Sequence, residues 1–224
     1  MKIFLILFLG AISSIALCTE IKIKFIKGRA KVNQAFLKKT SELKYGDVIK
    51  TGANSLVILQ LGNYSNVKIN ELSSVKIQPP KQTKSGKKRR GIILKAGSVF
   101  VNAAQKALKK DGSTLVVKTK FASMGVRGTE FFVSYSTSEK EKQKKDIWMC
   151  VNEGQVVVFN RKTRTKTFVN QGEGIQVPFG KDTSKPRPLA WTKKLNWSMN
   201  PKTDVVNKID IREAYYDLLN VDYD

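Results

Sequence analysis

The sequence of 224 residues contains no histidine and only two cysteines. The lack of histidine excludes Ser-His-Asp and Cys-His nucleophiles, and it removes both the usual general acid or base and the commonest metal ligand. The sequence also has no glycine-rich phosphate-binding loop and no acidic cluster with calcium-loop spacing. We therefore expect a non-enzymatic protein with no catalytic residues, no cofactor, no bound metal and no small-molecule substrate.

The N-terminal segment has the properties of a secretory signal. Residues 1–18, MKIFLILFLGAISSIALC, place one lysine before an apolar run and end in small residues. Ala16 and Cys18 fit the small-x-small rule, so we expect a signal peptide that is cleaved before Thr19. An uncleaved anchor and a lipidated Cys18 are the alternatives, but the apolar run is short for a membrane span and Leu17 is not the small residue of a lipobox.

Removal of this signal leaves Cys150 as the single cysteine, which excludes an intramolecular disulfide. Cys150 lies in an apolar run, and we interpret it as a buried small apolar residue. The predicted location is outside the cytoplasm, with no transmembrane span in the mature chain.

Short apolar or alternating runs, separated by Gly, Asn, Asp and Ser, predict an all-β fold. Ile21, Ile23 and Phe25 alternate with lysines, which is the period of a half-buried strand. Further strand-length runs occupy residues 48–50, 56–61, 67–69, 75–77, 91–94, 97–101, 114–118, 129–135, 147–151, 155–159, 165–169 and 174–177. We expect about a dozen short strands in a compact solenoid-like or sandwich-like body over residues 19–180.

A C-terminal tail, residues 181–224, follows this body. Asp210 and Glu213 form a capping-box-like pair, and Ile211, Tyr215 and Leu218 recur on one helical face. The spacing predicts a short α-helix at residues 210–220, which packs back on the β body or docks a partner.

The net charge of +23, from 41 basic and 18 acidic residues, favours contact with polyanions. The basic residues gather in three predicted loops around residues 81–90, 140–145 and 161–166. Loops that join successive strands often lie at one end of a β body, so these three could form one positive surface. The alternative is a basic surface that is solvated and binds no partner. Nucleic acid is not favoured, because aromatic residues do not interleave with the cations. The candidate anion- or partner-binding residues are Lys84, Lys87, Lys88, Arg89, Arg90, Lys144, Lys145, Arg161 and Arg164.

A glycine-bracketed arginine precedes the aromatic strand at residues 129–135. We expect a bend at Gly125 and Gly128 that aims Arg127 inward, where a buried guanidinium needs a carboxylate, and Glu130 is the nearest candidate. We predict that Arg127→Ala weakens or unfolds the domain. The motif that we interpret as structural comprises Gly125, Val126, Arg127, Gly128, Thr129 and Glu130.

These elements together resemble the FecR domain, which occurs in periplasmic regulators of bacterial iron-siderophore signalling and in stand-alone exported proteins. The similarity covers residues 28–178, and its most specific part is VKTKFASMGVRGTEFFV at residues 117–133. Other matching stretches are residues 28–32, 43–77, 94–101, 151–160 and 169–177. Residues 62–65, Gly-Asn-Tyr-Ser, depart from the family's usual Asp-Gly-Ser turn.

The resemblance implies a β-rich, solenoid-like periplasmic module that mediates protein contacts. The iron regulators also carry an inner-membrane helix and a cytoplasmic anti-sigma segment, which we do not recognise here, so we do not expect contact with a sigma factor or iron-citrate regulation. We expect a non-enzymatic exported domain for protein interaction, scaffolding or signalling in the bacterial envelope. The alternative is a basic binder of an anionic envelope polymer, such as lipopolysaccharide or a wall polymer, or of nucleic acid, through its loop clusters.

Overall fold

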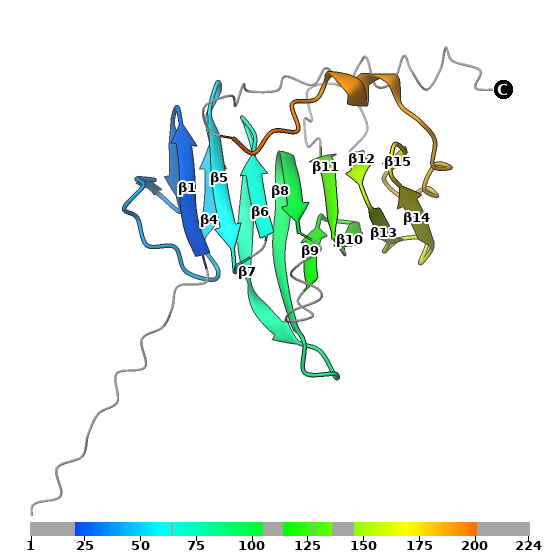
Figure 1. Cartoon of the computed structure of the whole chain (residues 1–224), viewed down its shortest axis with the longest axis horizontal. Helices are drawn as coiled ribbons and strands as arrows, with labels where there is room; N and C mark the ends of the chain where they lie inside the picture. Colours follow the sequence, from blue (N-terminus) through cyan, green and yellow to red (C-terminus); the bar gives the residue numbers. More distant parts are fainter. Residues whose placement is uncertain (1–20, 64, 105–113, 127, 136–145, 201–224) are drawn as a thin grey trace, which may run out of the picture.

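The computed structural model describes residues 21–63, 65–104, 114–126, 128–135 and 146–200 (Figure 1). Within these residues the chain forms fifteen strands and one short 3-10 helix, so the predicted all-β fold is confirmed. No helix in these ranges is long and apolar enough to cross a membrane. The expected signal peptide at residues 1–18 and the expected helix at residues 210–220 lie outside the described residues.

The strands form two layers, which we call sheet A and sheet B. Sheet A is antiparallel and has the order β1–β5–β6–β8–β11–β12–β15. Its strands are β1 (Ile21–Lys27), β5 (Leu56–Leu61), β6 (Ser65–Ile69), the second half of β8 (Lys88–Ala103), β11 (Thr129–Tyr135), β12 (Ile147–Glu153) and β15 (Gly174–Val177).

Sheet B has the order β3–β2–β4–β7–β8–β9–β10–β13–β14, in which β8 and β9 form the parallel pair. Its strands are β2 (Ala30–Val32), β3 (Ala35–Phe36), β4 (Val48–Thr51), β7 (Ser74–Gln82), the first half of β8, β9 (Thr114–Lys118), β10 (Ala122–Val126), β13 (Gln155–Asn160) and β14 (Lys166–Asn170). Because β8 belongs to both layers, all fifteen strands form one continuous mixed sheet.

The turn of β8 from one layer into the other occurs at Gly97. Residues before it pair with β7 and β9, and residues after it pair with β6 and β11. Gly97 has a φ of +84°, and a Cβ there would lie 2.5 Å from the Cα of Ser73. Ser98 N–H donates a hydrogen bond of 2.9 Å to Ser73 Oγ and fixes this corner. The corner therefore requires glycine, both for its backbone conformation and for the close approach of Ser73.

The strand order along each layer follows the order in the sequence, apart from the exchange of β2 and β3. The chain moves between the layers in short excursions while it advances along the long axis (Figure 1). The body is thus a sandwich in cross-section and solenoid-like in its progression. The two architectures that the sequence left open are both present.

One apolar core fills the space between the layers. Alternate residues of most strands enter it, as the pattern of two-residue periodicity predicted. On β8 and β9, for example, Ile92, Leu94, Leu115 and Val117 are at most 1% exposed, while their neighbours face outward.

A second apolar cluster lies on the outer face of sheet A, under residues 178–200, which we call the C-terminal strap. Sheet A contributes Phe100, Phe132, Trp148 and Cys150, and the strap contributes Leu189, Trp191 and Leu195, with Trp197 and Met199 partly buried. The strap includes the 3-10 helix η1 (Ala190–Lys194). The strap covers the outer face of β8, β11 and β12, so most of the described part of the expected tail packs on the β body.

Lys68 of β6 is buried beneath the strap and is 1% exposed. Its Nζ donates hydrogen bonds of 2.9 Å to the carbonyl of Asn196 and 2.6 Å to the carbonyl of Ser198. The same Nζ lies 4.6 Å from the centre of the Phe100 ring. A buried ammonium group requires such partners, and here they tie the strap to sheet A.

Candidate functional site

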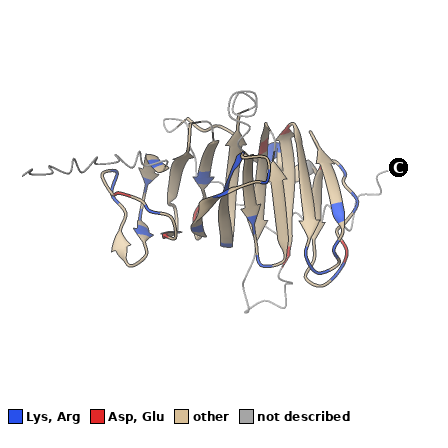
Figure 2. Cartoon of the chain, turned by 90° about the horizontal axis from the view of Figure 1, so that it is seen from below, with Lys and Arg blue, Asp and Glu red and all other residues tan. Residues whose placement is uncertain are grey.

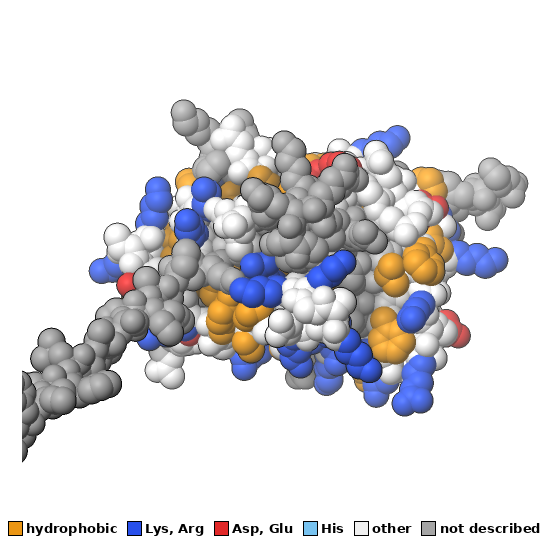
Figure 3. Space-filling model, turned by 60° about the horizontal axis from the view of Figure 1, so that its bottom comes forward, with side chains coloured by type: hydrophobic (Ala, Val, Ile, Leu, Met, Phe, Trp, Pro, Cys, Tyr) orange, Lys and Arg blue, Asp and Glu red, His pale blue; other side chains and the backbone are white. Residues whose placement is uncertain are grey.

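The outer face of sheet B differs from that of sheet A because no strap of the described chain packs against it. Its outward side chains are half-buried or exposed. Gly91, which has no side chain, is buried. Lys and Arg are spread over the strands and loops, whereas Asp and Glu are few (Figure 2). Figure 3 shows a face of the molecule on which basic side chains lie between apolar patches.

An apolar row crosses this outer face from β8 to β13. Gly91 pairs with Val116, Val116 with Gly125, and Gly125 with Val157, so the four residues lie side by side on neighbouring strands. We call these four residues the apolar row. A Cβ placed on Gly125 would have no atom within 4 Å, which shows that the space above it is open.

Four cations beside the apolar row are near one another, and we call them the basic cluster: Lys81, Arg89, Lys118 and Arg161. Lys81 and Arg89 are directly opposite each other on β7 and β8. Arg161 is held by a hydrogen bond of 2.8 Å from its Nη2 to the carbonyl of Thr119, next to Lys118. Burial, followed by the positive charges of Lys81, Arg161 and Arg89, lowers the pKa of Lys118 below its ordinary value.

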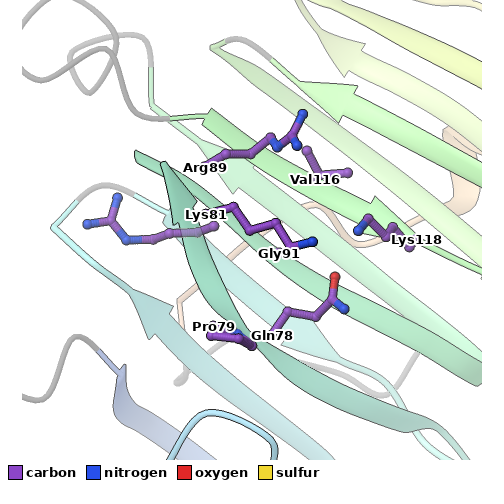
Figure 4. Close-up of a pocket in the computed structure, with 8 residues that line it drawn as sticks. Gln78, Pro79, Lys81, Arg89, Gly91, Val116 and Lys118 are labelled. Carbon is purple, nitrogen blue, oxygen red and sulfur yellow. The ribbon is translucent and has the colours of Figure 1, made fainter. Parts of the chain in front are cut away.

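A shallow hollow lies within the basic cluster, above Gly91 (Figure 4). It is lined by Gln78, Pro79, Lys81, Arg89, Arg90, Gly91, Val116 and Lys118. Gly91 forms its floor, and a Cβ there would lie 3.2 Å from Gln78 Oε1. The hollow therefore combines a side-chain-free floor with cationic walls, and it can receive an anionic group.

The loop residues predicted from the sequence do not share one end of the body. The turn at residues 83–87 precedes β8, and the turn at residues 161–165 follows β13. Strands β8 and β13 run in the same direction, because β8 is parallel to β9 while β10 is antiparallel to both β9 and β13. The two turns therefore lie at opposite ends of sheet B, which corrects the expected single loop surface. The third loop, with Lys144 and Lys145, lies outside the described residues.

Individual candidates also differ in what their side chains contact. Lys84 and Lys87 are exposed at the tip of the β7–β8 hairpin, and Lys88 and Arg89 are exposed on β8. Arg164 is exposed in the β13–β14 turn and has a φ of +59°. The Arg90 guanidinium packs against Gly62, where a Cβ would lie 2.6 Å from Arg90 Cζ. Among the described residues of the predicted set, only Arg89 and Arg161 join the basic cluster.

Lys118 and the apolar row were missed by reasoning from the sequence. The signal was present in the alternation of Thr114, Val116 and Lys118, which places all three on the outer face of β9. Lys118 belongs to no run of basic residues, because it lies within an apolar strand. The register that sets it beside Arg89 and Arg161 depends on the parallel β8–β9 pairing, which no local pattern encodes.

The glycine-bracketed motif contributes to both layers, with Gly125 and Val126 in β10 of sheet B and Thr129 and Glu130 in β11 of sheet A. Gly128 has the expected positive φ, +64°, whereas Gly125 does not and instead lies in the apolar row. Val126 and Thr129 are buried. Glu130 accepts hydrogen bonds of 3.2 Å from Asn102 Nδ2 and 2.6 Å from Asn152 Nδ2. Arg127 lies outside the described residues, so its pairing with Glu130 stays a prediction.

The described part of the chain contains no group of three or more Cys, Asp or Glu side chains placed to hold a metal ion. The arrangement on sheet B offers positive charge and apolar surface, which are properties of a binding face.

Comparison with known proteins gives a family and a fold. Residues 47–157 match the family model described as FecR protein. Two crystal structures of a protein described as "putative anti-sigma factor" from Parabacteroides distasonis ATCC 8503 match with a TM-score of 0.51 and 17% sequence identity. Each match covers 66% of this chain and 62% of the other chain. None of the curated proteins matches the chain.

Proposed function

The chain carries a FecR domain at residues 47–157, and from this we propose that it is an exported binding module that mediates a protein contact in signalling at the bacterial cell envelope. The role is regulatory or scaffolding and not enzymatic. It requires no cofactor, because the binding face itself supplies the charge and the apolar surface for the contact.

The observation that carries this proposal is the difference between the two outer faces. Within the described residues, the strap covers β6, β8, β11 and β12 on the outer face of sheet A, whereas charged and apolar side chains on the outer face of sheet B stay half-buried or exposed. Exposed apolar surface bordered by polar groups is typical of interaction sites. The outer face of sheet B is therefore the surface on which we place the partner.

The anti-sigma description of the structural relatives supports a signalling role in a general way. Their likeness to this chain is one of fold, and the chain spans about three fifths of their length, 62%. The identity of the partner is therefore approached through the chemistry of the binding face, and a link to iron signalling is not part of the proposal.

A second candidate function is binding of an anionic envelope polymer by the β7–β8 hairpin. The observation that favours it is the exposed run of Lys84, Lys87 and Lys88 at the hairpin tip. Such binding would be dominated by counterion release and would fall steeply with salt. A protein contact that includes apolar surface would be much less sensitive to salt.

A pull-down from envelope extract at low and at raised salt separates the two functions. The full-length chain is compared with Val157→Glu, which puts a negative charge into the apolar row, and with Lys84→Gln/Lys87→Gln at the hairpin tip. We expect a discrete protein that is retained at raised salt and by the tip variant but lost with Val157→Glu. Loss with salt and with the tip variant would instead assign the function to polymer binding.

Fractionation of cells that express the same chain tests the exported location. We expect the chain in the periplasmic or envelope fraction, shortened at its N-terminus. Recovery of the uncleaved chain in the cytoplasm would contradict export.

A further inference from the structure

The outer face of sheet B carries three parallel rows of side chains. Every charged residue in these rows is basic. The register across β7, β8, β9, β10, β13 and β14 defines the rows. One row contains Lys76, Ile93, Lys118, Ser123, Phe159 and Lys166; the central row contains Gln78, the apolar row and Phe168; the third contains Lys81, Arg89 and Thr114. No Asp or Glu occurs among these described positions.

This concentration of like charge is unfavourable for the isolated domain. Directly opposite like charges, such as Lys81 and Arg89, destabilise a sheet, and Lys118 is both partly desolvated and close to Lys81, Arg89 and Arg161. A carboxylate of a partner that lies among these cations adds attractive interactions, which offset their mutual repulsion. The basic cluster therefore matches an anionic ligand by charge complementarity.

The apolar row limits the chemistry of that ligand. It contributes half-buried Val116 and Val157, with Phe159 and the 55% exposed Phe168 beside it. A bare phosphate polymer gains nothing from such surface, whereas a polypeptide with apolar side chains buries it. The distance from Gly91 to Val157 spans three strand intervals, about 14 Å, which equals four to five residues of an extended chain at about 3.3 Å each.

The two glycines of the apolar row give the ligand room to approach. Gly125 has open space above it, and Gly91 forms the floor of the hollow. A carboxylate of the ligand can lie over the shallow hollow beside Arg89 and Lys118, and the next residues then lie along the row (Figure 4).

We propose that the outer face of sheet B binds an acidic polypeptide segment whose apolar side chains lie on the apolar row and whose carboxylates contact the basic cluster. The inference rests on the proposed protein-binding function and adds the chemistry of the partner. Arg89 and Lys118 are the residues on which recognition depends most, because they flank the hollow from both sides.

Fluorescence anisotropy with designed probes tests the chemistry of the partner. The probes are a labelled dodecapeptide of alternating Glu and Val, a dodecapeptide of alternating Glu and Ser, and an inorganic polyphosphate of matched charge as competitor. Measured at physiological ionic strength with the full-length chain, the Glu-Val peptide is expected to bind at least about tenfold more tightly than the other two. Equal or tighter binding of polyphosphate would overturn the proposal in favour of a polymer.

The protein variants locate the site. Arg89→Gln/Lys118→Gln is expected to weaken Glu-Val binding at least about tenfold, since charge-assisted hydrogen bonds are lost. Lys84→Gln/Lys87→Gln removes the same charge from the hairpin tip and is the matched control, with an expected change below about twofold. Equal effects of the two variants would show attraction by net charge alone and would overturn the site. Circular dichroism spectra of both variants confirm that the fold is unchanged.

The failure of this inference is distinguishable from the failure of the proposed function. A partner that is captured from the envelope through Val157, with no binding of the Glu-Val peptide, overturns only the acidic chemistry. Peptide binding without any captured protein leaves the site in place and overturns the role in an envelope protein contact.

Discussion

The ammonium group of Lys68 donates a hydrogen bond of 2.6 Å to the backbone carbonyl of Ser198, 130 residues further along the chain. This contact joins the middle of sheet A to the end of the C-terminal strap. It explains why a basic residue occupies a position that is 1% exposed on a central strand. The strap is thus part of the folded domain, and its removal would expose the aromatic cluster beneath it.

Replacement of Lys68 by alanine is expected to lower the free energy of unfolding by about 2–4 kcal/mol, because a large buried side chain and two hydrogen bonds are lost. Urea unfolding followed by tryptophan fluorescence measures this, since Trp191 and Trp197 lie in the strap. Lys24→Ala is the control, because Lys24 is an exposed residue of β1, and its expected change is below about 0.5 kcal/mol. Equal urea midpoints for Lys68→Ala and Lys24→Ala would show that the Lys68 hydrogen bonds do not stabilise the strap.

The corner of β8 provides a second test. Gly97→Ala is expected to lower the free energy of unfolding by about 2–4 kcal/mol, because the positive φ is strained and the new Cβ meets the backbone of Ser73. Gly86→Ala is the matched control, since its φ of +76° is similar but no atom lies within 4 Å of the added Cβ. We expect about 1 kcal/mol for the control. Similar losses for both would mean that the corner tolerates a side chain.

The buried thiol of Cys150 makes stability depend on pH. Burial raises the pKa of Cys150 in the folded chain. In the unfolded chain the thiol has its ordinary pKa of about 8.5. The thiol therefore contributes its full stabilisation below about pH 8.5, and this contribution is lost as the pH rises further, by about 1.4 kcal/mol per pH unit. Measured under reducing conditions, the stability difference between the native chain and Cys150→Ala should narrow above pH 8.5. A constant difference from pH 7 to 10 would contradict this reading.

The predicted pairing of Arg127 with Glu130 can be tested by a double-mutant cycle of Arg127→Ala and Glu130→Ala. Each single change is expected to destabilise the domain by about 1–3 kcal/mol. Arg127→Ala removes the predicted ion pair, and Glu130→Ala also removes the hydrogen bonds from Asn102 and Asn152. A coupling energy of about 1 kcal/mol or more in urea unfolding supports the ion pair. Additive losses would leave Glu130 as the partner of the two asparagines alone.

The fold was largely predictable because strand periodicity is a local property. Alternation on β1, β9 and β13 gave the strand positions, and turn residues separated them. The expected dozen strands became fifteen mainly because short pairs such as β2 and β3 leave little trace in the sequence. The alternation did not reveal that β8 belongs to both layers. In the sequence Gly97 looks like any turn glycine, and its close approach to Ser73 is visible only in the structure.

The candidate site was predictable only in part. Runs of basic residues identified Arg89 and Arg161 but also Arg90, whose guanidinium packs against Gly62. Lys118 joins the cluster through cross-strand register, which is a long-range property. The strap over sheet A was equally hidden, because tryptophans in a polar stretch do not indicate which surface they cover.

We propose the outer face of sheet B as the partner-binding surface. Photocrosslinking in intact cells tests it most directly, with a photoreactive amino acid in place of Val157 on the apolar row or of Lys193, which is exposed on the strap over sheet A. We expect one discrete crosslinked protein from position 157 and none from position 193. Crosslinking from position 193 alone would instead place the partner on the opposite face, over sheet A.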